Sequence, residues 1–427
     1  MRAFLAVAIE NHSVFFRRRC RFPLPTFLLA TTAVLASSRN FQMVSSLSAA
    51  ATVGTTVAAS VPTMNNMNVI AIEGSKASST SMGSKDFLLQ NPSGAYTTAR
   101  TCCDGTRIFE WDAHIQRTSS SLQSMIETSS SSSSSSSQLT NPIVLQHRLN
   151  ASVKEAVRLY KEINNKNKND NHHSQSQELK ITALVGWNKK KKKKTTTDLE
   201  SNEHCDKHYN GQFDKQDEEQ VAEDWVACHV MSLPPLPTRP VRVEVRGSPR
   251  ENANAKDSSW VSDRAPLEKL MSQSTVGPIN ELLLTNEQTH EILEGSQTNF
   301  YAIINGKLHT ADDGILKGTV RTLILDICEK EKIPIVLRPP TLDDIDQWEG
   351  ALISSTSRLA LPVDEVYIPS VNMPSQSTNV CKKFHNDEHH DDNDDDSSTA
   401  TANDNASVAN KIQKLVAMEV EARSTLI

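Results

Sequence analysis

The chain has 427 residues, of which 37% are hydrophobic and 14 are glycines. Even with glycine included, the apolar share is roughly 40%, below the roughly 45–50% of an average globular protein. The formal net charge of −6 gives no basic field for nucleic acid, and the lysine run at 189–194 has no interleaved aromatic residues. The composition therefore favours an enzyme of modest size that does not bind nucleic acid, with biased stretches added at 1–83, 129–137, 164–177, 188–222 and 374–408.

The N-terminal stretch has the composition of a targeting segment. Residues 1–72 contain a single acidic residue, Glu10, against six arginines, and are rich in Ser, Thr, Ala and Val. This profile is typical of an organellar transit peptide, so we expect a disordered leader over 1–83 and a location in a plastid or mitochondrion. A cytoplasmic protein with an untargeted extension and a secreted protein are the alternatives. The apolar run at 27–36 is too short to span a bilayer, and we expect no membrane span.

The seven cysteines form no CxxC pair and no regular spacing, which disfavours a disulfide framework and a structural zinc site. Cys102 and Cys103 lie on a predicted strand, where adjacent side chains point to opposite faces. We therefore expect these two thiols to pack and not to bond to each other.

An N-terminal α/β domain is predicted over 84–233. Two strand-like runs flank Asp104-Gly105, a dipeptide that favours a tight hairpin. Asp112 is placed to begin a helix that runs through Ile126, and apolar residues recur at helical spacing over 153–163. Strands are predicted at 179–185 and 226–233, and the lysine-rich insertion fits a hairpin loop between them, where extra length costs little closure entropy.

The proline-rich segment 234–240 is predicted to connect to a second, strand-rich domain over 241–373. A strand is expected at 281–284, and Asn305-Gly306 predicts a hairpin between 298–304 and 307–310. Gly318 is expected to precede an amphipathic helix, with strands at 333–337 and 351–355. We expect 374–408 to be a disordered acidic tail whose histidines bind no metal, and 409–427 to form a helix that packs back on the domain.

Ordered motifs give this sequence a resemblance to a known family. They begin, in chain order, at Gly94 (GAYTTAR), Asp104 (DG), His114 (HIQR), Lys256, Glu294 (EGSQTNF), Gly314 (GILKGTVR) and Ser355 (STS). This order resembles the class IV pyridoxal-phosphate enzymes, which include D-amino-acid aminotransferases, branched-chain aminotransferases and aminodeoxychorismate lyases. The resemblance covers residues 94 to about 370 and implies the α/β (α+β) fold of fold-type IV, with a small N-terminal α/β domain and a larger strand-rich C-terminal domain.

The resemblance assigns roles to individual residues. Lys256 is the implied catalytic residue, because pyridoxal phosphate needs a primary amine for its Schiff base. Glu294 is implied to face the pyridine nitrogen of the cofactor. Donors for the phosphate are implied at Arg117, Thr319, Val320 and Thr356.

Three further residues are expected on the substrate side of the site, without an individual role for each. Tyr96, Lys180 and Ser357 are expected to line it. Lys180 stands where branched-chain enzymes carry arginine on this strand, and lysine does not give the same bidentate fork to a carboxylate. The alternatives without a role in binding are a buried strand aromatic for Tyr96 and an exposed helix arginine for Arg117.

The implied activity is transfer of an amino group between an amino acid and a 2-oxo acid, with pyridoxal 5′-phosphate as cofactor and a homodimer as the assembly. A lyase of the aminodeoxychorismate type, and a family member that binds the cofactor without turnover, remain as alternatives.

Overall fold

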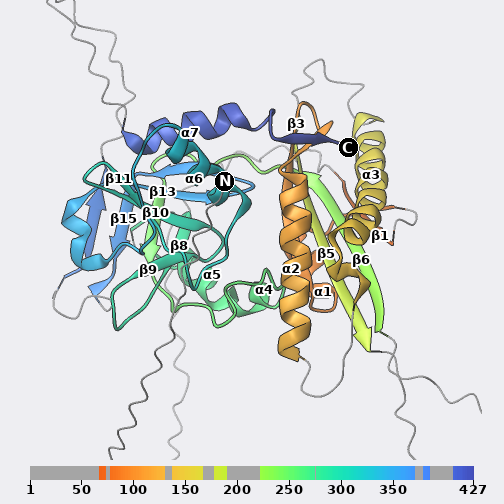
Figure 1. The fold of residues 1–427 in the computed structure, drawn as a ribbon, viewed down its shortest axis with the longest axis horizontal. Coiled ribbons are helices and arrows are strands. Elements are labelled where there is room, and N and C mark those ends of the chain that lie inside the picture. Colours follow the sequence, from red (N-terminus) through yellow and green to blue (C-terminus); the bar gives the residue numbers. More distant parts are fainter. Residues whose placement is uncertain are drawn as a thin grey trace, which may run out of the picture. The chain divides into compact units, whose positions relative to one another are not determined.

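The computed structural model describes residues 67–73, 77–129, 137–166, 177–189, 222–274, 276–370, 378–384 and 407–427. The predicted leader up to residue 66, most of the serine and lysine runs and the histidines of the acidic tail lie outside these residues. Helices and two sheets alternate along the described chain (Figure 1), which confirms the predicted mixed fold class. No helix within the described ranges is long and apolar enough to cross a membrane.

The first sheet has seven antiparallel strands in the order β17-β4-β3-β5-β6-β1-β2. Long strands β5 and β6 pair along their whole length, which confirms the hairpin predicted around the lysine-rich insertion. The strands are β1 (Asn68–Ile72), β2 (Ser78–Thr80), β3 (Ala95–Cys102), β4 (Arg107–Phe109), β5 (Leu179–Lys189), β6 (Ala222–Ser232) and β17 (Ser424–Leu426).

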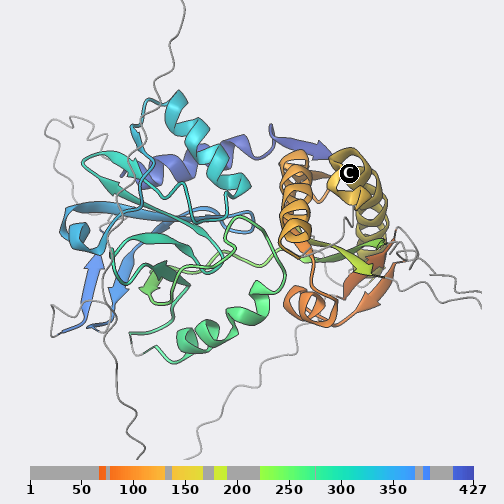
Figure 2. The same cartoon turned by 60° about the horizontal axis from the view of Figure 1, so that its bottom comes forward.

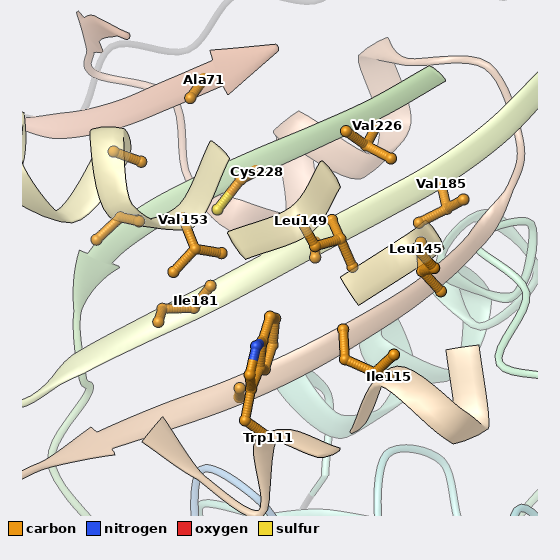
Figure 3. Close-up of a cluster of buried hydrophobic side chains, with 14 of the residues drawn as sticks. Ala71, Trp111, Ile115, Leu145, Leu149, Val153, Ile181, Val185, Val226 and Cys228 are labelled. Carbon is orange, nitrogen blue, oxygen red and sulfur yellow. The ribbon is translucent and has the colours of Figure 1, made fainter. Parts of the chain in front are cut away.

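Two long helices cover one face of this sheet, α2 (Trp111–Ser129) and α3 (Pro142–Lys166), with the short helix η1 (Gln138–Thr140) between them (Figure 2). Helix α2 was predicted from a cap at Asp112, which instead lies in its first turn. Helix α3 was predicted from the apolar spacing over 153–163 and begins earlier, at Pro142. Helix α1 (Ser84–Gln90) contacts β6 through a separate buried cluster. Figure 3 shows the main core, in which helix side chains meet strand side chains, among them Trp111, Ile115, Leu145, Leu149, Val153, Ile181, Val185 and Val226.

The alternation of side chains along the strands divides this sheet into two faces. On β3, Ala95 and Ala99 join the helix-covered core, whereas Tyr96 belongs to the cluster of α1. Thr98 pairs with Thr182, and Arg100 pairs with Lys180, in the register of β3 and β5. Because side chains two residues apart share a face, Tyr96, Thr98, Lys180 and Thr182 all point away from the main core. These four residues line the pocket described below.

The second sheet has ten strands, with β12-β11-β10-β9-β8-β7-β15-β16 in order and β13 joining β10 to β14. Its strands are β7 (Arg242–Val245), β8 (Glu281–Thr285), β9 (Ile292–Gly295), β10 (Asn299–Ile304), β11 (Lys307–His309), β12 (Ile335–Val336), β13 (Trp348–Ser355), β14 (Leu359–Val363), β15 (Glu365–Ile368) and β16 (Val380–Lys383). Its helices are α4 (Trp260–Asp263), α5 (Ala265–Ser272), α6 (Thr319–Lys330), η2 (Leu342–Gln347) and α7 (Val408–Glu419).

Several local predictions for this half are confirmed. Strands β10 and β11 form the expected hairpin, and Asn305 and Gly306 have φ values of 51° and 68°, in the left-handed region that this tight turn needs. Gly318 is the N-cap of α6, and the helix buries Val320, Leu323, Ile324, Ile327 and Cys328.

Two predicted disordered segments contain ordered strands. Asn68–Ile72 and Ser78–Thr80, placed in the leader, form β1 and β2, because Val69 and Ala71 fill the core beside β6. Residues 380–383, placed in the acidic tail, form β16, and the following Phe384 is buried. The predictions were wrong here because short apolar alternations were lost in the polar composition of the flanking sequence.

The helix predicted over 409–427 is shorter than expected, because α7 ends at Glu419 and Ser424–Leu426 form a strand. Helix α7 packs on α6 and β14, and the chain then ends as β17, which pairs with β4 of the first sheet. Arg423, between them, forms ion pairs with Glu110 (3.1 Å) and Asp326 (2.9 Å). The segment therefore ties the two sheets together.

The turn between β3 and β4 departs from the prediction in one respect. Cys103, Asp104 and Gly105 have φ values of 53°, 58° and 69°, so the chain leaves the strand geometry directly after Cys102. The thiols of Cys102 and Cys103 consequently lie on the same side, with their Sγ atoms 3.7 Å apart. The expectation that they face away from each other was wrong because strand alternation does not extend into this left-handed turn.

Candidate active site

A pocket of about 410 Å³ is lined by residues from both sheets. Its volume lies in the range of small-molecule sites, which is roughly 300–1,000 Å³. All nine residues predicted for the site line it: Tyr96, Arg117, Lys180, Lys256, Glu294, Thr319, Val320, Thr356 and Ser357. Residues separated by up to about 260 positions in sequence therefore share one cavity, while the role of each remains a prediction.

Lys256 is held in place by its backbone. Its carbonyl accepts a hydrogen bond from the Tyr96 N–H (2.9 Å), and its N–H donates to Ser121 Oγ (3.0 Å). The Nζ atom lies 4.7 Å from the centre of the Tyr96 ring. Burial lowers the pKa of Lys256 to about 8, and the nearby arginines, Arg117 among them, act in the same direction. The polar, loop-like segment around Lys256 thus holds a half-buried lysine whose backbone is fixed on both sides.

Tyr96 shares this environment. Burial alone raises the pKa of its phenol, but the positive charges of Lys256 and Arg264 and a hydrogen bond from Arg264 outweigh burial, so the pKa falls to about 8. Arg264 also pairs with Glu268 (2.9 Å), which in turn pairs with Lys85 on α1 (2.5 Å). A chain of charged groups therefore leads from the rim of the pocket to the phenol beside Lys256.

Glu294, on β9, is buried in an ion pair. Its Oε1 accepts from Arg250 Nε (2.7 Å) and lies 2.6 Å from Arg250 Nη2, while Oε2 accepts from the Leu316 N–H (3.0 Å). Burial raises the pKa of the Glu294 carboxyl, and these donors oppose that rise. The Arg250 guanidinium lies 5.3 Å over the ring of Trp260. A carboxylate oxygen can accept two hydrogen bonds, so Oε2, which accepts from the Leu316 N–H, can accept another.

The start of α6 forms an anion-binding cradle. The N-cap Gly318 has no side-chain cap for the helix, so the first N–H groups, including those of Thr319 and Val320, keep their donor capacity. The Thr319 and Thr356 hydroxyls lie 3.4 Å apart at this end of the pocket. A Cβ on Gly318 would lie 2.5 Å from Asn299 Oδ1, which binds the Gly318 N–H, so this loop requires glycine.

Arg117, on α2, supplies a half-buried positive charge to the same cavity. Its Nη2 donates to Thr97 Oγ1 (2.9 Å) and lies 3.3 Å from His114 Nδ1. Burial lowers the pKa of Arg117 to about 10, and its buried Nε atom has no hydrogen-bond partner among the described residues. Burial also holds the pKa of His114 well below its usual range, so the ring is neutral. A half-buried guanidinium with no acidic partner among the described residues is suited to an anionic ligand.

The substrate-side predictions are brought into the cavity as well. Lys180 Nζ donates to Ser84 Oγ (2.9 Å), and burial lowers the pKa of this lysine. The Ser357 carbonyl is 3.5 Å from Arg100 Nη1, and the neighbouring Arg358 pairs with buried Glu281 (3.0 Å).

Sequence reasoning missed two arginines that shape this cavity. Arg250 lies in a turn-rich segment with no periodic signal, and only its ion pair with Glu294 reveals its place. Arg264 left a weak signal, since it stands four residues before Glu268, a spacing that favours an ion pair on a helix.

Similarity to known proteins extends over part of the chain. A protein of Methanocaldococcus jannaschii, provisionally named a branched-chain-amino-acid aminotransferase, is 27% identical over 147 residues, 33% of this chain. The match spans 50% of that relative's length.

Similar folds occur among solved structures at low identity. The branched-chain aminotransferase of Thermoproteus uzoniensis with norvaline has a TM-score of 0.45 at 15% identity, over 70% of this chain and 87% of that chain. An aminotransferase from Brucella abortus bound to the cofactor PLP has a TM-score of 0.49 at 11% identity, over 83% of this chain and 99% of that chain.

A family model matches the segment of the chain that supplies most of the residues lining the pocket. Residues 208–366 match the model described as amino-transferase class IV, and this range includes Lys256, Glu294, Thr319 and Thr356. Arg117 and Tyr96 lie before it and join the site through the fold. Over this segment, the chain is similar to the class IV aminotransferases.

Proposed function

We propose that this protein is a pyridoxal-phosphate-dependent aminotransferase that moves an amino group between an amino acid and a 2-oxo acid. The main support is that one cavity holds a lysine with a lowered pKa together with a half-buried arginine that has no acidic partner among the described residues. Lys256 provides a reactive amine, and Arg117 provides a positive charge that a bound anion would neutralise.

The residues present fit a phosphorylated pyridine cofactor. Arg117, the N–H groups of Thr319 and Val320, and the Thr356 hydroxyl would hold the phosphate. The buried, unpartnered Nε of Arg117 and the uncapped start of α6 are donors without acceptors, which an anion satisfies. Glu294 would hold the ring nitrogen protonated, and Arg250 keeps that carboxylate in position.

The chemistry divides between the cofactor and the chain. When bound, pyridoxal phosphate supplies an electron sink for the bonds at the α-carbon of the amino acid. Lys256 Nζ would remove and return the proton at that carbon, a task for which a pKa of about 8 is suitable because it is close to the pH of the solution. The Tyr96 phenol beside Nζ stabilises its protonated form, since Tyr96 raises the pKa of Lys256.

Lys180 is the proposed partner of a substrate carboxylate. It lines the pocket on the same face of the sheet as Tyr96, and no acidic side chain pairs with it in the described part of the chain. Its hydrogen bond to Ser84 directs Nζ without neutralising it. Arginine at this position would give a fork, whereas lysine gives a point charge, so we expect looser orientation of the carboxylate.

Absorption spectroscopy tests the proposal. Added pyridoxal phosphate should produce the visible absorbance of cofactor bound to an amine in the wild type and in Lys269→Ala, an exposed lysine outside the pocket. Lys256→Ala should lose this absorbance. An unchanged spectrum in Lys256→Ala would refute the assignment of the reactive amine.

A half reaction distinguishes the alternatives that share this site. Conversion of the cofactor to its amine form by a panel of amino acids supports transamination. Release of pyruvate from aminodeoxychorismate without an added 2-oxo acid favours the lyase, and bound cofactor without either reaction favours an inactive binding protein.

Location and assembly are proposed from sequence alone. We propose that residues 1–66, which precede the first described strand, direct the protein to a plastid or mitochondrion, and that the protein is a homodimer. A fusion of 1–66 to a fluorescent reporter that stays diffuse in the cytosol contradicts the first statement. A monomeric mass by light scattering contradicts the second.

A further inference from the structure

The turn between β3 and β4 carries a pair of adjacent thiols outside the active-site pocket. Cys103 Sγ donates to Cys102 Sγ at 3.7 Å, and Cys102 Sγ donates to Ser424 Oγ at 3.1 Å. Both cysteines are half-buried, and neither lines the pocket. The two sulfurs are therefore in contact with each other and accessible to a small reagent.

The carboxylate of Glu178 bridges the residues of this turn. Glu178 accepts hydrogen bonds from Thr101 Oγ1 (2.6 Å), the Asp104 N–H (3.1 Å) and the Gly105 N–H (3.2 Å). These bonds hold three successive residues from Cys103 in the left-handed region, which cysteine rarely adopts. Because the surrounding bonds enforce this conformation, the side-by-side arrangement of the sulfurs belongs to the folded state.

Direct disulfide formation fits this geometry poorly. Consecutive Cα atoms are about 3.8 Å apart across a trans peptide, less than the roughly 4.4–6.8 Å found for ordinary disulfides. By contrast, two sulfurs that each lie about 2.3 Å from one bridging atom are about 3.3–3.8 Å apart for bond angles between those of a pyramidal and a tetrahedral centre. The observed separation of 3.7 Å thus matches two sulfurs bound to a single atom.

We propose that Cys102 and Cys103 form a two-sulfur chelation site for one thiophilic atom, specifically the arsenic of a monosubstituted trivalent arsenical. Arsenic in such a compound keeps one organic group and completes its shell with two sulfurs. A divalent metal needs more ligands, and within the described ranges no group of three or more Cys, His, Asp or Glu side chains is placed to hold one.

The reaction balances without an oxidant. With phenylarsine oxide, two S–As bonds form, the arsenic–oxygen bond breaks, and the two thiol protons leave with the oxygen as water. Partial burial and the neighbouring Cys102 thiol raise the pKa of Cys103 to about 11, so the Cys103 thiol enters this reaction protonated at neutral pH.

Intact-mass spectrometry of the full chain with phenylarsine oxide tests the site. The wild type should keep one phenylarsenic group after washing with a monothiol and lose it to ethane-1,2-dithiol. Cys102→Ser and Cys103→Ser should each release the group in the monothiol, with binding weaker by about 10²–10⁴-fold because two linked contacts become one. Cys381→Ser, which removes an exposed single thiol, should behave as the wild type.

A second variant tests the geometry while keeping both thiols. Glu178→Gln loosens the turn and should weaken retention of the arsenical relative to the wild type. Retention by either single cysteine variant, or equal retention by Glu178→Gln and the wild type, overturns the proposed chelation by a preformed pair. Peptide mapping that places the group on any other cysteines does so too.

Discussion

Replacing Arg250 with methionine tests how the wall of the pocket around Glu294 is held together. The two side chains are 9% and 4% exposed, and both Arg250 Nε and Nη2 reach Glu294 Oε1, at 2.7 Å and 2.6 Å. Methionine keeps most of the apolar stem but removes the charge. The variant therefore leaves a buried carboxylate with the Leu316 N–H as its remaining donor among those identified.

The expected cost follows from this burial. Removing one partner of a buried ion pair destabilises a protein by about 3–5 kcal/mol, because the other charge stays buried. Arg158→Met is the matched control, since Arg158 is 54% exposed and pairs with Glu155 and Glu162 on the surface of α3. Loss of such surface pairs costs about 0–1 kcal/mol.

The assay is urea unfolding of the protein without added cofactor, followed by circular dichroism and tryptophan fluorescence. Arg250→Met should lower the unfolding free energy by several-fold more than Arg158→Met. The loss should also depend on pH. Burial already raises the pKa of Glu294, and removing Arg250 raises it further.

The sign of the pH dependence is fixed by linkage. A group whose pKa is raised in the folded state favours folding at low pH and loses that contribution as the pH rises through the folded pKa. The cost of Arg250→Met should therefore be greatest near neutral pH and shrink on acidification, as Glu294 takes up a proton. Equal losses in the two variants, or a cost that grows at low pH, would refute the buried pair as the cause.

Three further predictions concern residues in or beside the pocket. Lys256→Met should stabilise the cofactor-free protein by up to about 3 kcal/mol below pH 8, because a lowered pKa means that the folded state resists protonation of this amine; the gain should vanish toward pH 10.5, and equal urea midpoints at pH 7 would contradict it. Tyr96→Phe should move the pKa of Lys256 further below about 8, since Tyr96 raises that pKa; the pH dependence of borohydride trapping of pyridoxal phosphate on Lys256 measures the shift, and an upward shift would be inconsistent with it. Gly94→Ala should cost about 1–3 kcal/mol by overpacking, because its Cβ would lie 2.2 Å from the Val185 carbonyl, whereas Gly350→Ala, with nothing nearer than 3.7 Å, should leave the melting temperature nearly unchanged.

The sequence predicted those parts of the fold that depend on local pattern. Asn305-Gly306 and Gly318 carry their conformational requirement in the residue itself, so the hairpin and the helix start were found where expected. The ordered motifs likewise predicted nine residues that share one pocket.

Features that depend on tertiary contacts were missed. Arg250 is marked only by its ion pair with Glu294, and the strands at 68–80 are stabilised by packing against β6 from more than a hundred residues away. Cys102 and Cys103 were misread because Glu178, distant in sequence, bends the chain between them. In each case the deciding partner lies on another element, where a local pattern carries no information.

The pocket contains more positive than negative side chains, and this difference bears on which ligands it can bind. Arg250 and Arg358 are each matched to a buried carboxylate, and Arg264 shares Glu268 with Lys85. In the described part of the chain, no carboxylate pairs with the remaining cations, which are Arg117, Lys180 and Lys256.

Burial lowers the pKa of all three, so each of these charges is costly while the cavity contains only water. A phosphate at Arg117, a carboxylate at Lys180 and an aldehyde that reacts with the Lys256 amine would each remove one of these costs. This imbalance of charge therefore favours binding of anionic groups in the pocket, which the proposed cofactor and substrate would provide.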